Sequence, residues 1–357
     1  MSELRINNIT DTAGSSGPII AGVSTVTSTS HMVMPSGPTE MRGGRGRGVF
    51  GTGYNNAPNS SLNSMQFVTI ATRGNTEDFG DLAVSSIAKG SFGSATRGFF
   101  AGGDSVPGQA DNKAIEFTIF SSSGGGNDFG DMTNTKAYLS GMSNDIRGFF
   151  VGGSTTPEYV KQNVIEFVTM ASTGDGSDFG DLGIASITYN GATANNTRGL
   201  VALGQAGGSP QPSRQIQFIT LSTLGDAQDF GEATTLNKSG AAAVASSTRA
   251  CFMGGVGTTS DATHISNVID FVTISTLGNA QDFGDTTVAV NGLASASNST
   301  RGLHAGGRTG SPAAEALQNV IGFITIASTG NAADFGDLVT PTRMLSGCSD
   351  SHGGIGE

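Results

Sequence analysis

The sequence lacks tryptophan and contains few cysteines, histidines and tyrosines, with two, four and four copies in 357 residues. The two cysteines lie at unrelated places, so we expect free thiols, no disulfide framework and synthesis in a reducing cytosol. The four histidines share no spacing and suggest neither a metal set nor a catalytic triad. These absences predict a protein that is not an enzyme and that uses no metal or cofactor.

Charged residues and long apolar runs are also scarce. Only 13% of the residues are charged, and the net charge of −11 argues against binding to nucleic acid or to anionic membranes. No apolar run approaches the ~20 residues that a membrane-spanning helix needs. The opening residues lack the basic-then-apolar plan of a secretion signal. We therefore expect neither nucleic-acid binding nor membrane insertion.

An Asp-Phe-Gly motif recurs at nearly constant steps of 50, 50, 51, 53 and 52 residues. A fixed period near 50 residues indicates an array of equivalent units rather than a set of independent domains. The six aspartates of the motif are Asp78, Asp128, Asp178, Asp229, Asp282 and Asp334.

Two further landmarks keep their distance from this motif. A phenylalanine stands 11 residues before every aspartate. An arginine follows the aspartate by 19 or 20 residues in five units, and Arg47 precedes the first unit. The six arginines are Arg47, Arg97, Arg147, Arg198, Arg249 and Arg301.

Four short strands fit between these landmarks. The first follows the arginine and ends at a Gly-Gly pair, the second carries the spaced phenylalanine, and the third carries Asp-Phe-Gly. The fourth is rich in Ala, Ser and Val, whose small side chains suit a crowded innermost position. Four strands in each of six units predict an all-β, six-bladed β-propeller.

The two ends of the array predict how the ring closes. Only one inner-strand candidate, near residues 344–348, follows the last motif, whereas two strands, at 48–51 and 65–70, precede the first motif. One C-terminal strand and three N-terminal strands would complete the sixth blade and remove the exposed sheet edges. We therefore expect the propeller to span residues 45–357.

Residues 1–44 lie outside the array and are dominated by Thr, Ser and Val, so extended structure is expected rather than helix. Two interpretations stay open. The segment is either a flexible tail or an arm that docks onto a partner, or onto a second copy of the chain, by strand addition. The second interpretation makes the segment an attachment and oligomerisation element.

The recurrent acids and arginines each allow a structural and a ligand-binding interpretation. Residues 174–178 resemble the spacing of a calcium loop, but Glu232 replaces the second aspartate in the fourth unit. We expect these acids to cap turns and form ion pairs, with bound calcium as the alternative. We expect the arginines to tie blades together through carboxylates or carbonyls, with anion binding at the channel mouth as the alternative.

The loop after each Gly-Gly pair varies most between units. These loops cover 104–113, 154–162, 205–214, 256–266 and 308–318, and loops that join equivalent strands emerge on one face. We therefore predict a contact surface there, although drift in unconstrained loops would give the same variability. The candidate contact residues are Glu158, Tyr159, Lys161, Arg214 and His264.

The repeat resembles the kelch, or galactose-oxidase-type, propeller repeat over residues 47–350. It shares the strand that ends in Gly-Gly, the following strand of the Ile-Glu-Phe type, and an aromatic residue before the next repeat. It departs from that pattern in using phenylalanine where tryptophan is usual. The resemblance implies the propeller fold but little about function, because propellers serve many roles.

The phrases Phe-Ile-Thr-Ile-Ala-Ser-Thr-Gly-Asn, Asp-Phe-Gly-Asp-Leu and Thr-Arg-Gly resemble repeats in virion structural proteins of tailed marine phages, notably cyanophages. The opening residues 6–14 are also similar to such proteins. This resemblance implies a tail, fibre or neck component, assembled in the host cytoplasm and attached by its N-terminal segment to other virion proteins. Its propeller would decorate the particle or bind a host-surface glycan or protein. The alternatives are a cellular kelch-type scaffold for protein interaction or a glycan-processing propeller.

Overall fold

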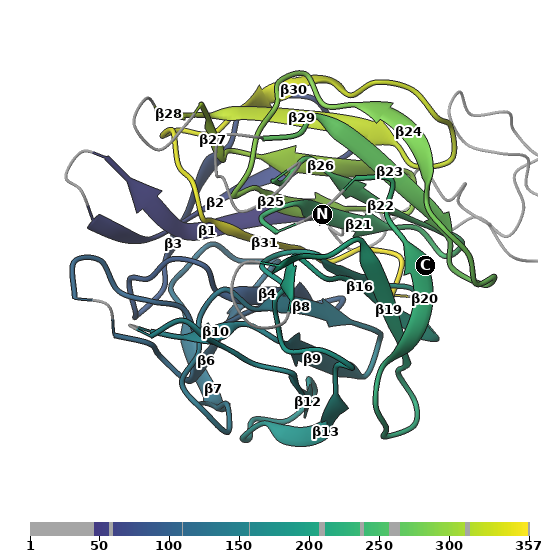
Figure 1. Cartoon of the computed structure of the whole chain (residues 1–357). Coiled ribbons are helices and arrows are strands. Elements are labelled where there is room, and N and C mark those ends of the chain that lie inside the picture. Colours follow the sequence, from purple (N-terminus) through teal and green to yellow (C-terminus); the bar gives the residue numbers. More distant parts are fainter. Residues whose placement is uncertain are drawn as a thin grey trace, which may run out of the picture. The chain divides into compact units, whose positions relative to one another are not determined.

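The computed structural model describes residues 46–56, 60–108, 110–156, 158–206, 211–235, 239–256, 265–310 and 315–355. These residues form six sheets of four antiparallel strands arranged in a ring, with no helix among them (Figure 1). The all-β, six-bladed β-propeller expected from the sequence is thus confirmed, and it is consistent with kelch-type repeats. The predicted N-terminal arm, residues 1–44, lies outside the described residues. Within those ranges, no helix could cross a membrane.

We number the blades 1 to 6 and give their strands from the inside outward. The inner strands are β31 (Ser346–Ser349), β4 (Gly90–Gly93), β8 (Ser140–Ser143), β15 (Ala192–Ala194), β21 (Ala242–Ala245) and β25 (Ala294–Ser297). The second strands are β1 (Arg47–Asn55), β5 (Arg97–Ala101), β9 (Arg147–Val151), β16 (Arg198–Ala202), β22 (Arg249–Met253) and β26 (Arg301–Ala305).

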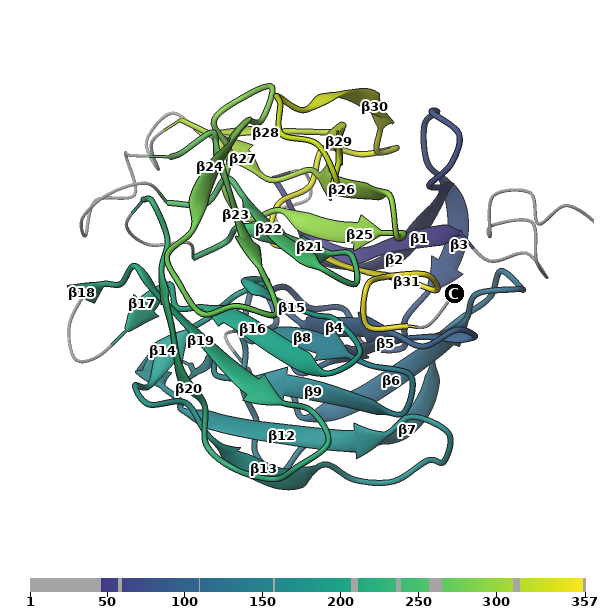
Figure 2. The ribbon, with the colours of Figure 1, turned by 90° about the vertical axis from the view of Figure 1, so that its right-hand side faces the viewer.

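The third strands are β2 (Ser60–Thr69), β6 (Ala114–Ile119), β12 (Val164–Thr169), β19 (Gln215–Thr220), β23 (Val268–Thr273) and β29 (Val320–Thr325). The outer strands are β3 (Glu77–Asp81), β7 (Asn127–Asp131), β13 (Ser177–Asp181), β20 (Gln228–Glu232), β24 (Gln281–Asp285) and β30 (Ala333–Asp337). The inner strands contact one another around the ring and gather in the middle of Figure 2.

Blade 1 closes the ring in the expected way. The C-terminal strand β31 pairs with β1 from Gly48↔Ser349 to Gly51↔Ser346, and β2 and β3 complete the sheet. Beyond β31, Asp350 Oδ1 accepts hydrogen bonds from the backbone N–H groups of Gly46 (2.6 Å) and Arg47 (3.0 Å). One strand from the C-terminus therefore holds the two ends of the ring together.

The Asp-Phe-Gly motif is a packing device within the outer strand. In blade 3, Phe179 packs edge-to-face against Phe167, with ring centres 6.0 Å apart, and the same pair recurs in every blade. Gly180 has a positive φ (151°), and a Cβ there would lie 2.5 Å from the carbonyl oxygen of Gly225 in the next blade. The motif is needed because the aromatic ring fills the blade core and glycine permits the close approach of the next blade.

The loops after the Gly-Gly pairs contain short ladders that the sequence did not predict. β10 (Ser154–Thr155) pairs with β11 (Val160–Lys161), and β27 (Arg308–Thr309) pairs with β28 (Ala316–Leu317). In blade 4, β17 (Gln205–Ala206) lies between β14 (Ser186–Ile187) and β18 (Gln211–Pro212). Two-residue strands leave no alternation in a sequence, which is why these loops read as unstructured.

Candidate functional site

A closed ring of backbone hydrogen bonds surrounds the propeller axis on the side of the variable loops. One residue just before each inner strand donates its N–H to the carbonyl oxygen of its counterpart in the preceding blade, over 2.8–3.2 Å. The members of this ring are Ala88, Tyr138, Tyr189, Gly240, Gly292 and Met344. The six connections that lead into the inner strands therefore meet at this ring of hydrogen bonds.

Every member of the ring has a positive φ, from 28° at Tyr189 to 73° at Gly292. Glycine adopts this conformation freely. Tyr138 and Met344, both at 57°, adopt it at a cost of the order of 1–2 kcal/mol each. Strained non-glycine residues of this kind cluster at functional sites, so the ring marks a candidate site.

Two neighbouring residues of blade 4, Tyr189 and Asn190, contact the blades on the other side of this ring. The aromatic ring of Tyr189 lies against the two glycines of the hydrogen-bonded ring, Gly240 and Gly292. Its Cδ1 is 3.4 Å from the place that a Cβ on Gly240 would occupy. Next to it, Asn190 Nδ2 donates to the carbonyl oxygens of Leu293 (2.7 Å) and Leu345 (3.0 Å) in blades 6 and 1. Blade 4 therefore contacts blades 6 and 1 directly at this level.

A cavity of about 500 Å³ adjoins the ring of hydrogen bonds at Tyr138 and Met344, and we call it the tyrosine pocket. The ring centre of Tyr138 lies 6.0 Å from that of Tyr159 and 5.8 Å from that of Tyr189. Residues that line the pocket include Tyr54, Tyr138, Tyr159, Asp104, Arg343 and Met344. All four tyrosines of the chain therefore gather at one place, three in the pocket wall and Tyr189 beside Tyr138.

Asp104 is the acidic group of the pocket. Only 2% of its surface is exposed, and its Oδ1 has no hydrogen-bond partner among the described residues. Burial, and then the charge of the neighbouring Asp111, raise the pKa of Asp104 to about 6. Asp111 itself is held by Thr156, whose Oγ1 donates to it over 2.7 Å. Asp104 is thus a buried carboxylate in the cavity wall, with one oxygen that has no hydrogen-bond partner among the described residues.

Arg343 is the basic group of the pocket. Its guanidinium lies 4.6 Å from the centre of the Tyr54 ring, and its Nε pairs with Glu315 over 2.9 Å. Arg308 also pairs with Glu315, over 2.7 Å. Burial raises the pKa of Tyr138, and the charges of Asp104 and Arg343 act on it with opposite sign. Both charges therefore act on the same tyrosine hydroxyl.

The predicted contact residues divide between the pocket and its surroundings. Tyr159 lines the pocket, whereas its neighbour Glu158 is exposed. Lys161 lies in β11, where burial lowers its pKa. Arg214 is exposed in the loop of blade 4, and His264 lies outside the described residues.

Sequence reasoning missed most of the pocket, including Tyr54, Asp104, Tyr138 and Arg343. A signal was present, because Tyr138 and Tyr189 occupy the same place in successive repeats, just before the strand of small residues. A tyrosine at a position otherwise filled by Gly, Ala or Met could have pointed to the site.

The recurrent arginines lie away from the pocket and join neighbouring blades through carbonyl groups. The Nη1 of Arg97, Arg147, Arg198, Arg249 and Arg301 donates over 2.9–3.3 Å to a carbonyl oxygen just after the third strand of the next blade, and Arg47 bonds Phe120 in the same way. Each guanidinium also lies 4.3–5.1 Å from the centre of the phenylalanine ring in its own third strand.

The recurrent acids also contact protein groups. The first aspartate of each Asp-Phe-Gly motif is exposed. In the segment that resembles a calcium loop, Asp175 Oδ1 accepts a 2.9 Å hydrogen bond from the backbone N–H of Asp131 in the preceding blade. Among the described residues, no group of three or more His, Cys, Asp or Glu side chains is placed to hold a metal ion.

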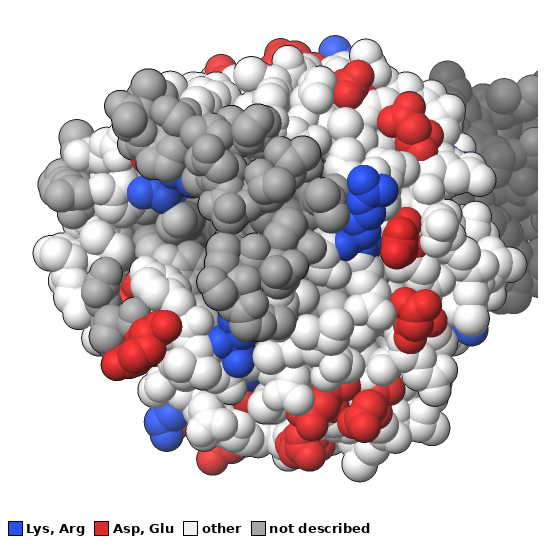
Figure 3. Space-filling model, viewed as in Figure 1, with Lys and Arg blue, Asp and Glu red and all other residues white. Residues whose placement is uncertain are grey.

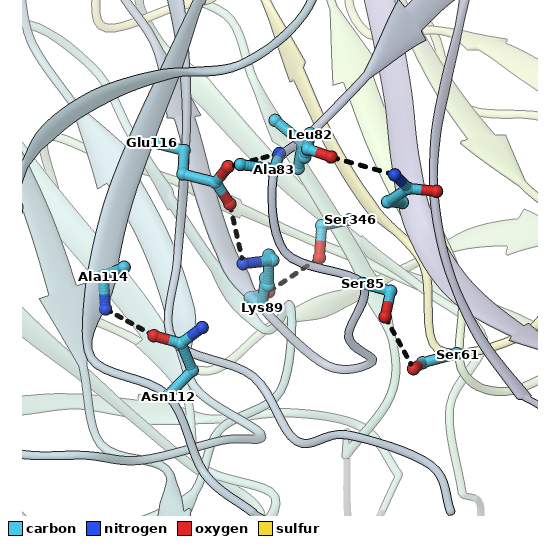
Figure 4. Close-up of polar contacts among 10 residues, drawn as sticks. Ser61, Leu82, Ala83, Ser85, Lys89, Asn112, Ala114, Glu116 and Ser346 are labelled. Carbon is cyan, nitrogen blue, oxygen red and sulfur yellow. Dashed lines mark hydrogen bonds and ion pairs between the residues drawn. The ribbon is translucent and has the colours of Figure 1, made fainter.

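Two buried ion pairs position the segments that carry the ring. Lys89, next to Ala88, pairs with Glu116 over 3.3 Å, and Glu116 also accepts from the backbone N–H of Ala83 (Figure 4). Lys136, two residues before Tyr138, pairs with Glu166 over 2.8 Å. Glu116 and Glu166 therefore hold the connections that precede the inner strands of blades 2 and 3.

At the other end of the channel, Ser143 Oγ lies 3.0 Å from His352 Nε2. The geometry does not make this a nucleophile and its base. His352 Nδ1 accepts from the backbone N–H of Gly354, so in the neutral ring the proton sits on Nε2. Ser143 Oγ in turn donates to the carbonyl oxygen of Gly93 over 2.7 Å. The pair therefore pins the C-terminal segment against blades 2 and 3.

Comparison of the sequence with protein-family models and with curated proteins returned no match. The function must therefore be argued from the pocket and the surface. Figure 3 shows acidic side chains along the right and lower edges of the face in view, in keeping with the net charge of −11. The tyrosine pocket contains aromatic rings, one carboxylate and one guanidinium, and such groups can together bind a small polar group.

Proposed function

We propose that this protein is a non-enzymatic binding module and a structural component of a tailed-phage particle, at the tail, fibre or neck. The observation that carries the binding role is the gathering of all four tyrosines at one pocket on the face of the variable loops, with three in its wall and Tyr189 beside Tyr138. Small-molecule sites typically combine aromatic and apolar walls with a few placed polar groups, and this pocket is lined by three tyrosines together with Asp104 and Arg343.

The proposed place in a phage particle is supported by the amino-acid sequences of the repeats and of residues 6–14, which resemble those of virion structural proteins. In this proposal, residues 1–44 attach the chain to other virion proteins and the propeller binds the host surface or decorates the particle. A chain that must persist outside a cell benefits from a ring closed by β31 and β1, because this pairing completes blade 1 and ties the two ends of the ring together.

The experiment has two parts. Particles purified on a density gradient from lysed host cells are searched for this chain by mass spectrometry, and we expect it at a fixed ratio to the other virion proteins. Light scattering then compares the full chain with a variant that lacks residues 1–43. Assembly by the full chain only supports the attachment role. A chain that is found only in the cytosol, with no partner in particles, would favour the cellular scaffold instead.

A further inference from the structure

The polar groups of the tyrosine pocket restrict the charge of its ligand. Asp104 and Arg343 both line the cavity, and both charges act on Tyr138. An anion would be attracted by Arg343 but repelled by Asp104, whereas a cation would be attracted by Asp104 but repelled by Arg343. Arg343 is also already paired with Glu315, so its remaining N–H groups are suited to neutral acceptors. A neutral ligand that both donates and accepts hydrogen bonds complements this pair.

The aromatic walls restrict the shape of the ligand. Tyr54, Tyr138 and Tyr159 line one cavity of about 500 Å³, and the guanidinium of Arg343 lies over the Tyr54 ring. Tyrosine suits surfaces where an apolar face and a polar edge are contacted together. A ring-shaped ligand with C–H groups on its faces and hydroxyl groups on its edge meets both demands.

Asp104 supplies the third observation. Within the part of the chain that the structure describes, its Oδ1 is buried without a hydrogen-bond partner, and a buried carboxylate oxygen that lacks a donor costs free energy. Vicinal hydroxyl groups of a ligand would donate to this oxygen and remove that penalty. A polar side chain that is satisfied only by a ligand is a mark of a binding site, because the folded protein gains nothing from it.

We infer that the tyrosine pocket binds a neutral saccharide, with a sugar ring packed on the tyrosine faces, hydroxyl groups donating to Asp104 and acceptor oxygens facing Arg343. This inference rests on the binding role proposed above and names its ligand class. A single sugar unit is small, so its dissociation constant falls in the millimolar range, and several copies on one particle would strengthen attachment to a glycan-covered surface.

The protein carries its own reporter for this test. It contains no tryptophan, and its four tyrosines all lie in or next to the pocket, so tyrosine fluorescence of the full chain reports on this site alone. The probes are glucose, galactose, mannose, N-acetylglucosamine and their common disaccharides. Tetramethylammonium chloride and sodium sulfate, at matched ionic strength, represent the cation and the anion.

We expect at least one saccharide to change the fluorescence with saturation and the two salts to leave it unchanged. Calorimetry then measures that saccharide on variants. Tyr159→Ala and Asp104→Asn should each weaken binding by about tenfold or more, since each removes a stacking face or a charged acceptor. Glu158→Ala is the matched control, because this neighbour of Tyr159 is exposed and does not line the pocket. It should keep the affinity within about twofold, as expected for a surface substitution.

Three outcomes would overturn the inference: saturable binding of tetramethylammonium in place of sugars, no response to any saccharide, or sugar binding that Tyr159→Ala and Asp104→Asn do not weaken. Unchanged thermal unfolding of the Tyr159→Ala variant shows that its loss of binding is not loss of fold. The two proposals fail separately. Presence in particles without sugar binding overturns only the ligand class, whereas sugar binding without presence in particles overturns only the virion role.

Discussion

Arg249 Nη1 donates a 2.9 Å hydrogen bond to the carbonyl oxygen of Ile326 in the next blade, while its guanidinium lies 4.3 Å from the centre of the Phe271 ring in its own blade. One planar side chain therefore binds two blades at once. Lysine can do neither task as well, because it lacks the flat fork that stacks and donates together.

We predict that Arg249→Lys lowers the free energy of unfolding by about 1–3 kcal/mol, the sum of one interblade hydrogen bond and one cation–π contact. Chemical denaturation at neutral pH measures the change. Arg214→Lys is the control, because Arg214 is exposed in a variable loop and should move stability by less than about 0.5 kcal/mol. Equal effects of the two substitutions would contradict a bridging role for the repeated arginines.

The buried pair Lys136–Glu166 gives a second prediction. Both side chains are almost fully buried, and Glu166 also accepts from the N–H and Oγ1 of Thr133. Lys136→Met leaves the buried carboxylate of Glu166 without its ion-pair partner. We therefore expect the free energy of unfolding, measured with denaturant, to fall by about 3–5 kcal/mol.

A double variant tests the cause of that loss. In blade 4, Gln217 takes the place of Glu166, and its Oε1 accepts from the backbone N–H of Gly183 over 3.0 Å without a lysine partner. Lys136→Met with Glu166→Gln should therefore recover most of the lost stability, because a neutral amide keeps the backbone contact. If the double variant is as unstable as the single one, the lysine acts through packing rather than charge.

His304 gives a prediction on pH. It is buried, neither ring nitrogen has a hydrogen-bond partner among the described residues, and burial lowers its pKa to about 4. Between this value and the ordinary 6.5, the unfolded chain binds more protons than the folded chain. Stability should therefore fall as the pH falls through that window.

His304→Phe should remove this dependence. The equivalent positions in blades 2, 3 and 5 hold Phe100, Phe150 and Phe252, and Gly322 leaves space opposite His304. At pH 5 we expect the variant to be about 2 kcal/mol more stable than the natural protein, from about 1.4 kcal/mol per pKa unit. Thermal unfolding of both proteins at pH 5 and pH 7 measures the difference, and a gain that is the same at both pH values would contradict protonation as the cause.

The sequence predicted the parts of the fold that repeat and missed the parts that do not. The spaced phenylalanines, the Asp-Phe-Gly motif and the Ala-rich strands recur with the period, so the blade core and the closure by β31 could be inferred. The pocket could not, because Tyr54 lies near the end of β1 whereas Asp104, Tyr159 and Arg343 lie in connections of other blades, and only the closed ring brings them together. The positive φ of Tyr138 also contradicts local preference and depends on the hydrogen-bonded ring.

The last prediction concerns the stability cost of Asp104. Its pKa is about 6 in the folded protein against an ordinary 3.8, so between these values the folded state binds more protons than the unfolded state. Stability should therefore decrease as the pH rises from 4 to 6, and the cost should be complete above pH 6. Asp104→Asn removes the charge, and we expect a gain of about 2 kcal/mol at pH 7 and almost none at pH 4.

Asp78→Asn is the matched control, because Asp78 is exposed and its neutralisation should change stability by less than about 0.5 kcal/mol. In the saccharide proposal, the charge that lowers stability at neutral pH also accepts hydrogen bonds from the ligand. The variant Asp104→Asn should therefore be more stable and bind saccharide more weakly. Thermal unfolding as a function of pH, together with calorimetry on the same preparation, measures both effects, and a variant that is less stable at pH 7 would show that Asp104 supports the fold rather than the pocket.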